Sequence, residues 1–480
     1  MSVVDDSPGA AESATSRRRE QRAWYWYDWA NTTFYTSVTT VFGAIYFSSI
    51  AAEDAKTDIA RNGPQPCMAV NADTGVFEKN TLVNCDVSLF GIEFPAGALW
   101  GYLLAAATLI QVLVLPITGA IADRSHAKKR MLATFAFIGA GSTCLLVTVV
   151  ETTWQPALIF YTIGQVGYGA SIVVYYSFLP QIAEADERDD VSARGWAFGF
   201  LGGGCALALQ LVLVTLHETF GIAEGTAVRL CFVISGLWWA GFTLIPLRRL
   251  KQHQVPPHEA ERGASVLTAG FRELRTTFKA ARAFPLTLAF LGAYLVYTDG
   301  ISTVVSVSAQ YGTEELKFGE QTLIITILVI QFVAYLGGML HGLVARRLGA
   351  KRTILGSLVV WIVVLVCAYF VKAGEELQFF ALAAGIGLVL GGTVALSRSL
   401  FSQMIPRGKE AQYFSLYEIC ERGTAWMGPL LFASIGHATG TFRYAIIALG
   451  VFFVVGFVLL WLVPVRKAIR AAGNAEPERL

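Results

Sequence analysis

Charged residues are scarce in this chain. Only 15% of its 480 residues are Asp, Glu, Lys or Arg, whereas soluble proteins carry about 25%. Hydrophobic residues make up 54% of the chain. This composition excludes a soluble globular protein and indicates one embedded in a membrane. The net charge of +2 gives no reason to expect a nucleic-acid partner, and none is predicted.

Two signals that the sequence lacks narrow the function further. No segment has the pattern GxxxxGK[ST] of a phosphate-binding loop, so we do not expect ATP hydrolysis. We predict no enzyme, no cofactor and no metal site, and any transport would use a gradient or be passive. Residues 1–21 contain Arg17, Arg18 and Arg19 but no apolar core, which argues against a signal peptide. They are predicted to form a disordered cytoplasmic tail.

Long apolar runs account for most of the remaining chain. Twelve of them, each of roughly 20 residues, are long enough to cross a bilayer core of about 30 Å. Lys and Arg are concentrated in one set of loops, the set that includes both termini, which places the termini in the cytoplasm. We therefore predict an all-α membrane protein with twelve transmembrane helices. The predicted spans are 22–50, 95–121, 131–151, 156–182, 194–217, 227–247, 283–311, 321–345, 353–372, 376–404, 410–436 and 442–465.

A short basic turn occurs twice. The first copy, Gly119–Arg130, reads GAIADRSHAKKR, and the second, Gly342–Thr353, reads GLVARRLGAKRT. Two equivalent halves in one membrane protein are typical of transporters built by duplication. The sequence thus predicts two six-helix bundles over 22–247 and 283–465, joined by a cytoplasmic linker over 248–282 and followed by a cytoplasmic tail over 466–480.

The two long loops each allow two interpretations. The external loop 51–94 contains Cys67 and Cys85, which can form a disulfide in an oxidising exterior or remain two free thiols. In the linker 248–282, apolar residues recur at helical spacing from Leu267 to Ala281, with basic residues beside them. This pattern favours an amphipathic helix on the inner leaflet over a plain basic linker.

The first basic turn is a candidate cytoplasmic gate. Gly119 allows close helix approach, and Asp123 lies beside Arg124, with Arg130 closing the turn. A carboxylate at this position can pair with arginines or face a helix N-terminus, and such contacts can form in one conformation and break in another. The alternative is simple anchoring of basic residues at the inner leaflet. The second copy has Arg346 in place of the acid.

Several motifs resemble those of a known family. The basic turn is similar to the loop signature of the major facilitator superfamily. WYDWANTTF (Trp26–Phe34), RGWAFGFLGGG (Arg194–Gly204), YTDGIST (Tyr297–Thr303) and the long segment Ser397–Phe432 resemble its "unknown major facilitator" branch, which includes vacuolar amino-acid effluxers linked to autophagy. The resemblance covers about residues 22 to 465. It implies a solute permease, with amino acids such as leucine and tyrosine as the solutes.

Acidic residues inside predicted spans are costly and are often functional. Asp28 lies near the start of the first span, with Asn31 on the same helix face. It is either a site residue or an interfacial carboxylate kept wet by headgroups. Asp299 lies past the middle of the seventh span, next to Gly300. It can contact solute or a proton, or it can cap a break in the helix.

The eleventh predicted span carries three charges, Glu418, Glu421 and Arg422. Glu418 and Arg422 are four residues apart and can form a neutral structural pair. A buried guanidinium is also a fork for a ligand carboxylate, and a nearby acid can bind the ligand ammonium or a coupling proton. We take Asp28, Asn31, Asp299, Glu418, Glu421 and Arg422 as candidate substrate or proton-binding residues.

These observations predict a secondary transporter that moves a small organic solute, an amino acid, by alternating access. Proton coupling stays open, and membrane lipids are the other expected contact. The alternatives are a sensor or scaffold that keeps the transporter fold, a channel, or a permease for another metabolite or drug. We expect a monomer in the cell (plasma) membrane.

Overall fold

The computed structural model describes residues 8–70, 77–79, 81, 83–125, 127–150, 152–251, 282–423 and 425–480. We call residues 8–251 the first half and 282–480 the second half. The amphipathic helix predicted between Leu267 and Ala281 lies outside the described residues.

The first half is helical apart from two small antiparallel hairpins, β1–β2 and β3–β4. Its helices are α1 (Pro8–Thr33), the π-helix η1 (Phe34–Phe42), α2 (Gly43–Thr57), α3 (Ile59–Asn62), α4 (Leu99–Arg124), α5 (Lys128–Leu145), η2 (Leu146–Thr148), α6 (Gln155–Tyr176), α7 (Leu179–Ile182), α8 (Arg188–Thr215) and α9 (Glu224–Arg249). Its strands are β1 (Met68–Val70), β2 (Phe77–Lys79), β3 (Asp86–Leu89) and β4 (Ile92–Pro95). A disulfide between Cys67 and Cys85 ties the two hairpins together.

The second half is helical wherever it has regular structure. Its helices are α11 (Pro285–Gln310), the π-helix η3 (Tyr311–Glu315), α12 (Glu320–Leu348), α13 (Ala350–Phe370), α14 (Glu376–Gln403), α15 (Glu410–Gly423), α16 (Met427–Thr439), α17 (Phe442–Ala448), α18 (Gly450–Leu462) and α19 (Val465–Ala471).

Within the described ranges, eleven helical segments are long and apolar enough to cross a membrane. They coincide with eleven of the predicted spans and confirm an all-helical membrane protein. The predicted eleventh span, 410–436, is instead divided between α15 and α16. Its sequence explains the division, because Gly423 is a poor helix former and Pro429 is tolerated only in the first turn of a helix.

The predicted disordered tail over 1–21 is wrong for residues 8–21. They are the first part of α1, which continues without a break into the membrane segment. Gln21 is buried and donates through its side-chain amide to the carbonyl of Ile182 at 2.9 Å, and Arg17 pairs with Glu184 at 2.6 Å. These contacts hold the helix against the turn between α7 and α8. Sequence composition missed them because they join segments far apart in the chain.

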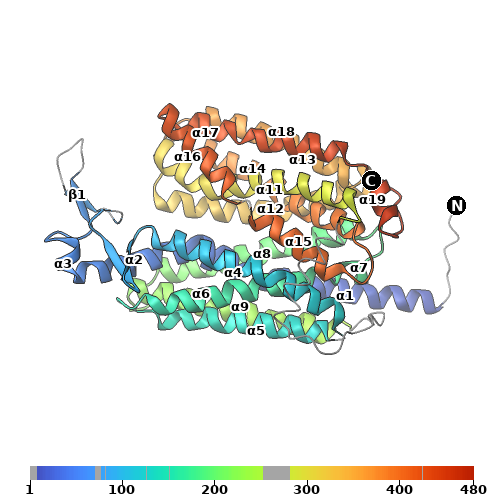
Figure 1. Ribbon diagram of the computed structural model, residues 1–480, viewed down its shortest axis with the longest axis horizontal. Coiled ribbons are helices and arrows are strands. Elements are labelled where there is room, and N and C mark those ends of the chain that lie inside the picture. Colours follow the sequence, from blue (N-terminus) through green and yellow to red (C-terminus); the bar gives the residue numbers. More distant parts are fainter. Residues whose placement is uncertain are drawn as a thin grey trace.

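The two halves lie side by side in Figure 1, with the first half (blue to green) below the second (yellow to red). The strands project at one end, whereas the start of α1 and the end of the chain lie at the other, which we call the terminal end. Helix α8 packs against α12 and α14 of the second half, and α15 packs against α4 and α6 of the first. These crossings bring Asp123 and the charges of α15 to the boundary between the halves, whereas Asp299 lies in α11, which packs within the second half.

Candidate functional site

At the terminal end, Asp123 joins the two halves. Its buried carboxylate, in the last turn of α4, accepts the backbone N–H groups of Ala411 and Gln412 at 2.9 and 2.8 Å. These donors belong to the first turn of α15, where a negative charge is favoured by the helix dipole. Lys128 lies 3.2 Å from the same carboxylate. The sequence allowed Asp123 to pair with arginines or to face a helix N-terminus. In the structure it faces the N-terminus of α15.

Gly119 makes this contact possible. A Cβ atom at Gly119 would lie 2.6 Å from the carbonyl oxygen of Ala411, so a side chain there would collide with backbone. Of the other two predicted gate residues, Arg124 is the last residue of α4, and Arg130 is exposed on α5. In the second copy of the turn, Gly342 faces Ala193 of α8, again across the boundary.

A buried ion pair crosses the boundary between α1 and α14. Asp28 accepts from the Arg398 guanidinium at 3.3 Å and from the Tyr175 hydroxyl at 2.8 Å. Arg398 is 0% exposed, and it also donates to the hydroxyl and the carbonyl of Ser192, both at 2.9 Å. Its guanidinium lies 4.7 Å from the ring of Trp24. The charge is thus fully enclosed by a carboxylate, hydrogen bonds and an aromatic face.

The sequence around this pair is built for close approach. A Cβ atom at Gly195 of α8 would lie 2.6 Å from the Trp24 ring and 2.8 Å from an Asp28 oxygen. Only a glycine there leaves room for the pair. This explains why RGWAFGF and WYDWANTTF occur together, because α8 and α1 pack face to face.

Further polar contacts close the boundary at the terminal end. Ser399 donates to the Asp189 carboxylate at 2.5 Å, and Arg188 donates to the carbonyl of Ser402 at 3.1 Å. Both pairs join the start of α8 to the end of α14. Together with the Asp123 and Arg398 contacts, they hold the two halves closed at this end.

A second charged cluster lies on α15, deeper in the molecule. Arg422 donates from Nη2 and Nε to one oxygen of Glu418, at 2.9 and 3.2 Å. Glu421 accepts the Tyr294 hydroxyl at 2.8 Å. The Arg422 guanidinium also lies 5.7 Å from the ring of Tyr168 on α6 of the first half. The cluster therefore faces the first half across the boundary.

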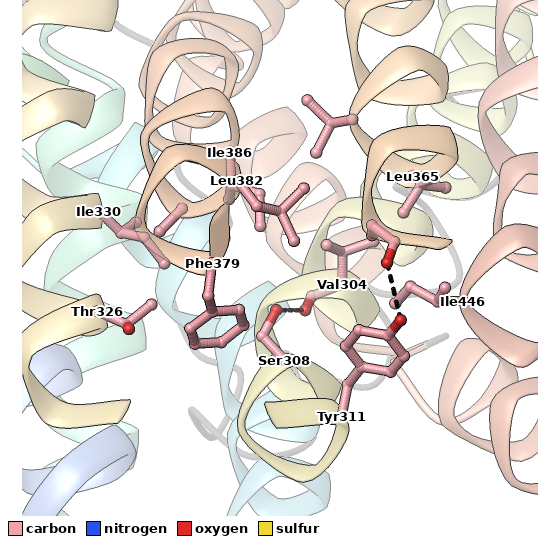
Figure 2. Close-up of a pocket in the computed structure, with 13 residues that line it drawn as sticks. Val304, Ser308, Tyr311, Thr326, Ile330, Leu365, Phe379, Leu382, Ile386 and Ile446 are labelled. Carbon is pink, nitrogen blue, oxygen red and sulfur yellow. Dashed lines mark hydrogen bonds between the residues drawn. The ribbon is translucent and has the colours of Figure 1, made fainter. Parts of the chain in front are cut away.

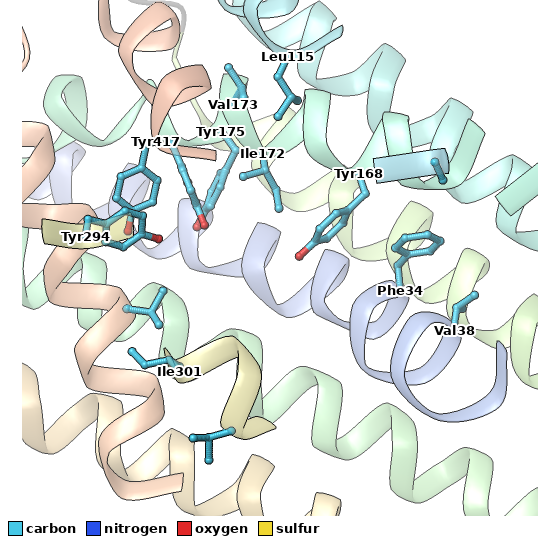
Figure 3. Packing of buried hydrophobic residues seen from close by; sticks show 14 of the residues in the cluster. Phe34, Val38, Leu115, Tyr168, Ile172, Val173, Tyr175, Tyr294, Ile301 and Tyr417 are labelled. Carbon is cyan, nitrogen blue, oxygen red and sulfur yellow. The ribbon is translucent and has the colours of Figure 1, made fainter. Parts of the chain in front are cut away.

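Arg422 is less enclosed than its partner. Its side chain is 12% exposed, compared with 1% for Glu418. Tyrosines surround the cluster: Figure 3 shows Tyr294 and Tyr417 gathered together, with Tyr168 of the first half farther along α6. The rings of Tyr294 and Tyr417 stack at 4.1 Å. This arrangement offers a cation, an acid and aromatic walls to a small ligand.

The remaining predicted residues stand apart from this cluster. Asp28 is joined to Arg398, and Asn31 is buried in α1 with its amide nitrogen unpartnered among the described residues. Asp299 is buried in α11. A pocket within the second half is lined mainly by apolar residues such as Val304 and Phe379, and no predicted site residue lines it (Figure 2).

Arg398 is the site residue that the sequence prediction missed. It falls inside the predicted span 376–404, but it was not singled out there as a site residue. The structure places it in α14, five residues before the helix ends at Gln403. A lone arginine within a predicted span is the signal that could have found it.

Comparison with known proteins agrees with this architecture. The model of the family described as "Vacuole effluxer Atg22 like" matches residues 16–473. The chain is 29% identical over 448 residues to an uncharacterized MFS-type transporter, YxiO, of Bacillus subtilis, covering 93% of this chain and 95% of that protein. It is 25% identical over 543 residues to autophagy-related protein 22-2 of Emericella nidulans, covering 94% and 91% of the two chains.

The fold is also that of solved transporters. The human organic anion transporter MFSD10 superposes with a TM-score of 0.65 at 13% identity, covering 92% of this chain and 99% of that one. The family match spans nearly the whole chain, and the fold match covers both halves. The chain therefore belongs to the Atg22-like family and is a permease of the major facilitator superfamily.

Proposed function

We propose that this permease moves an amino acid by alternating access, with Arg422 and Glu421 as the main ligand-binding residues. The observation that carries the proposal is the position of Arg422. It is a partly exposed guanidinium at the boundary between the halves, and among the described residues its ion pair engages only the edge formed by Nε and Nη2. In alternating access, a site at this boundary can face either side of the membrane in turn.

The chemistry of the cluster suits an amino acid. Glu418 occupies the Nε and Nη2 edge of Arg422, which leaves Nη1 for a ligand carboxylate. Glu421 accepts the Tyr294 hydroxyl, lies in the field of Arg422, and supplies a negative charge for the ligand ammonium. Tyr168 adds an aromatic face for the ligand side chain. A ligand that lacks either charged group would lose its contact with Arg422 or with Glu421.

The contacts at the terminal end support an arrangement closed toward the cytoplasm. In this proposal both termini are cytoplasmic, and α15 with α16 completes a twelfth crossing. The bundles over 22–247 and 283–465 then rock against each other around the Arg422 cluster. Opening toward the cytoplasm would separate Asp123 from α15 and Arg398 from Asp28.

The family description names a vacuole effluxer, so we propose export of amino acids across the membrane in which the protein resides. The plasma-membrane location predicted from the sequence stays a prediction, because the family description names the vacuole and the Bacillus subtilis relative comes from a bacterium. A monomeric state also stays a prediction.

Flux measurements in proteoliposomes test the proposal. Purified protein is reconstituted, and uptake and exchange of a panel of labelled amino acids are measured. Arg422→Lys keeps the positive charge but removes the planar guanidinium, which can donate two parallel hydrogen bonds to a carboxylate. Because a hydrogen bond to a charged group is worth about 1.5–3 kcal/mol, we expect apparent affinity to fall about 10- to 100-fold.

Arg443→Lys is the matched control. Arg443 also pairs with an acid, Glu315 at 2.9 Å, but it does so away from the Arg422 cluster. We expect its transport to resemble that of the wild type. Absence of saturable flux for every amino acid in correctly folded wild type would refute the amino-acid proposal. Equal loss in both variants would refute the role of Arg422.

A further inference from the structure

Asp299 is a buried acid without a charged or side-chain hydrogen-bond partner among the described residues. Its side chain is 1% exposed, and neither carboxylate oxygen has a hydrogen-bond partner among the described residues. The backbone N–H of Gly428, in the first turn of α16, faces the carboxylate but does not form a hydrogen bond of acceptable geometry. One turn farther along α11, the hydroxyl of Thr303 is likewise buried and unpartnered. The Thr303 side chain also faces Gly428, because a Cβ atom added at Gly428 would meet the Thr303 side chain first.

The other buried acids of this protein are all compensated. Asp28 has Arg398 and Tyr175, and Asp123 has Lys128 and two backbone N–H groups. Among the other buried acids of the described residues, Glu418 pairs with Arg422 and Asp189 accepts from Ser399. Glu410 accepts the backbone N–H of Gly408 at 3.0 Å, and Glu20 lies 4.0 Å from the ammonium of Lys251. An ionised carboxylate taken out of water without such partners is strongly disfavoured. Burial without compensation therefore favours the protonated, neutral form of Asp299, whereas the other buried acids have partners that stabilise a negative charge.

No described charge is placed to neutralise Asp299. On the helices packed against α11, Arg398 of α14 and Arg422 of α15 are already paired with acids, and α18 has no titratable side chain. The only titratable residue of α16 is His437, in its last turn, whereas Asp299 faces the first. The basic residues of α19 lie at the terminal end and Glu315 of η3 pairs with Arg443.

We propose that Asp299 is the site of a coupling proton, an inference that rests on the proposed transport function. In the conformation seen here, a proton occupies one carboxylate oxygen of Asp299 and leaves the site neutral. When α16 shifts in the transport cycle, the N–H of Gly428 comes within bonding distance of the carboxylate, and the Thr303 hydroxyl, one turn along the same helix as Asp299, rotates to donate to it. They stabilise the carboxylate, and the proton leaves as H⁺ to the opposite side. One proton then crosses per solute, by protonation and deprotonation of a single oxygen.

The break between α15 and α16 gives this step its link to the solute. Arg422 and Glu421 lie in the last turn of α15, and Gly428 lies in the first turn of α16. A ligand that binds Arg422 moves the end of α15. The start of α16 then moves with it relative to Asp299. The solute and proton sites are thus separate and mechanically joined.

Asp299→Asn tests the proposal because it fixes the side chain in the neutral form. Purified variant and wild type are compared in proteoliposomes loaded with a pH-sensitive dye. Two transport modes are measured: accumulation driven by a pH gradient, and exchange of labelled for unlabelled solute, which needs no net proton movement. We expect exchange near the wild-type rate, together with loss of gradient-driven accumulation and of the solute-evoked pH change. Thr298→Val, a neighbouring buried substitution on α11, is the control and should keep both modes.

Three outcomes would overturn the inference. The first is retained pH-driven accumulation in Asp299→Asn, and the second is loss of exchange in a variant that remains monodisperse and folded. The third is a wild-type flux that follows a Na⁺ gradient instead of a pH gradient.

A solute-independent measurement separates this inference from the proposed function. Infrared difference spectra between low and high pH should show the carbonyl band of a protonated carboxylic acid in the wild type, and Asp299→Asn should lack it. If wild type exchanges no amino acid but the band behaves in this way, the proposed function fails and proton binding at Asp299 stands. If the band is unchanged in Asp299→Asn, the proton site itself is refuted.

Discussion

Removing the charge of Asp28 should open the transporter at the terminal end. Asp28→Asn leaves the Arg398 guanidinium, which is 0% exposed, without its counter-charge. Breaking a buried pair in this way costs about 3–5 kcal/mol. We expect the lower end, about 3 kcal/mol, because the amide oxygen and Ser192 still accept hydrogen bonds from Arg398. The cost falls on the closed state only, since opening exposes Arg398 to water.

The size of the shift can be worked out from this cost. A free energy of about 3 kcal/mol corresponds to a factor of about 100 in the equilibrium between closed and open states. A wild type that is about 1% open would become about half open. Spin labels at Arg249→Cys and Arg407→Cys, exposed positions on opposite halves at the terminal end, would report this as a second, longer distance. The labelled background needs the free cysteines replaced: Cys144, Cys205, Cys231, Cys367 and Cys420.

Asp190→Asn is the matched control for Asp28→Asn. Asp190 pairs with Arg194 at 2.9 Å within α8, the helix that packs against Asp28. The side chain of Asp190 is 25% exposed, and that of Arg194 is 41% exposed. An exposed pair of this kind contributes at most about 1 kcal/mol, so the distance distribution should stay close to that of the wild type. If Asp28→Asn also leaves the distribution unchanged, the ion pair does not hold the halves together and the reasoning is wrong.

Two more predictions follow from close contacts elsewhere. Gly119→Leu places side-chain atoms within 2.6 Å of the Ala411 carbonyl, so the same spin-label pair should show an open population. An unchanged distribution would mean that α4 and α15 separate without opening the terminal end. Replacing Cys67 and Cys85 with serine removes a cross-link spanning 18 residues, worth about 3 kcal/mol by loop closure. Limited proteolysis should then cut the loop 51–94 faster while transport is retained, and unchanged cleavage would contradict a stabilising role.

Hydrophobicity alone predicted most of the fold. Each continuous span is a run of apolar residues long enough to cross a bilayer, and this property is local in sequence. The two errors arose where local signals were weak. Residues 8–21 are polar, and they are helical in contact with the α7–α8 turn. The eleventh span has an apolar average, but Gly423 and Pro429 divide it.

The candidate site was only partly predictable from sequence. Asp123 was found because it distinguishes two copies of one turn, and the Glu418–Arg422 spacing fixed their pairing within one helix. Arg398 could not be joined to Asp28 in this way, because the two residues are 370 positions apart and meet only through the packing of α1 and α14. Contacts between the halves depend on tertiary structure that one sequence does not encode in any local pattern.

The divided eleventh span connects the proposed steps of transport. The N-terminus of α15 is held by Asp123, so opening of the terminal end must release it. Arg422, in the last turn of the same helix, contacts the first half through Tyr168. The start of α16 then faces Asp299. Because α15 is only 14 residues long and separate from α16, it can move as a rigid body. Its movement then links the Asp123 contact at its start with Arg422 at its end. A continuous helix over 410–439 would couple gate, solute and proton rigidly, whereas the break lets each contact form and release in turn.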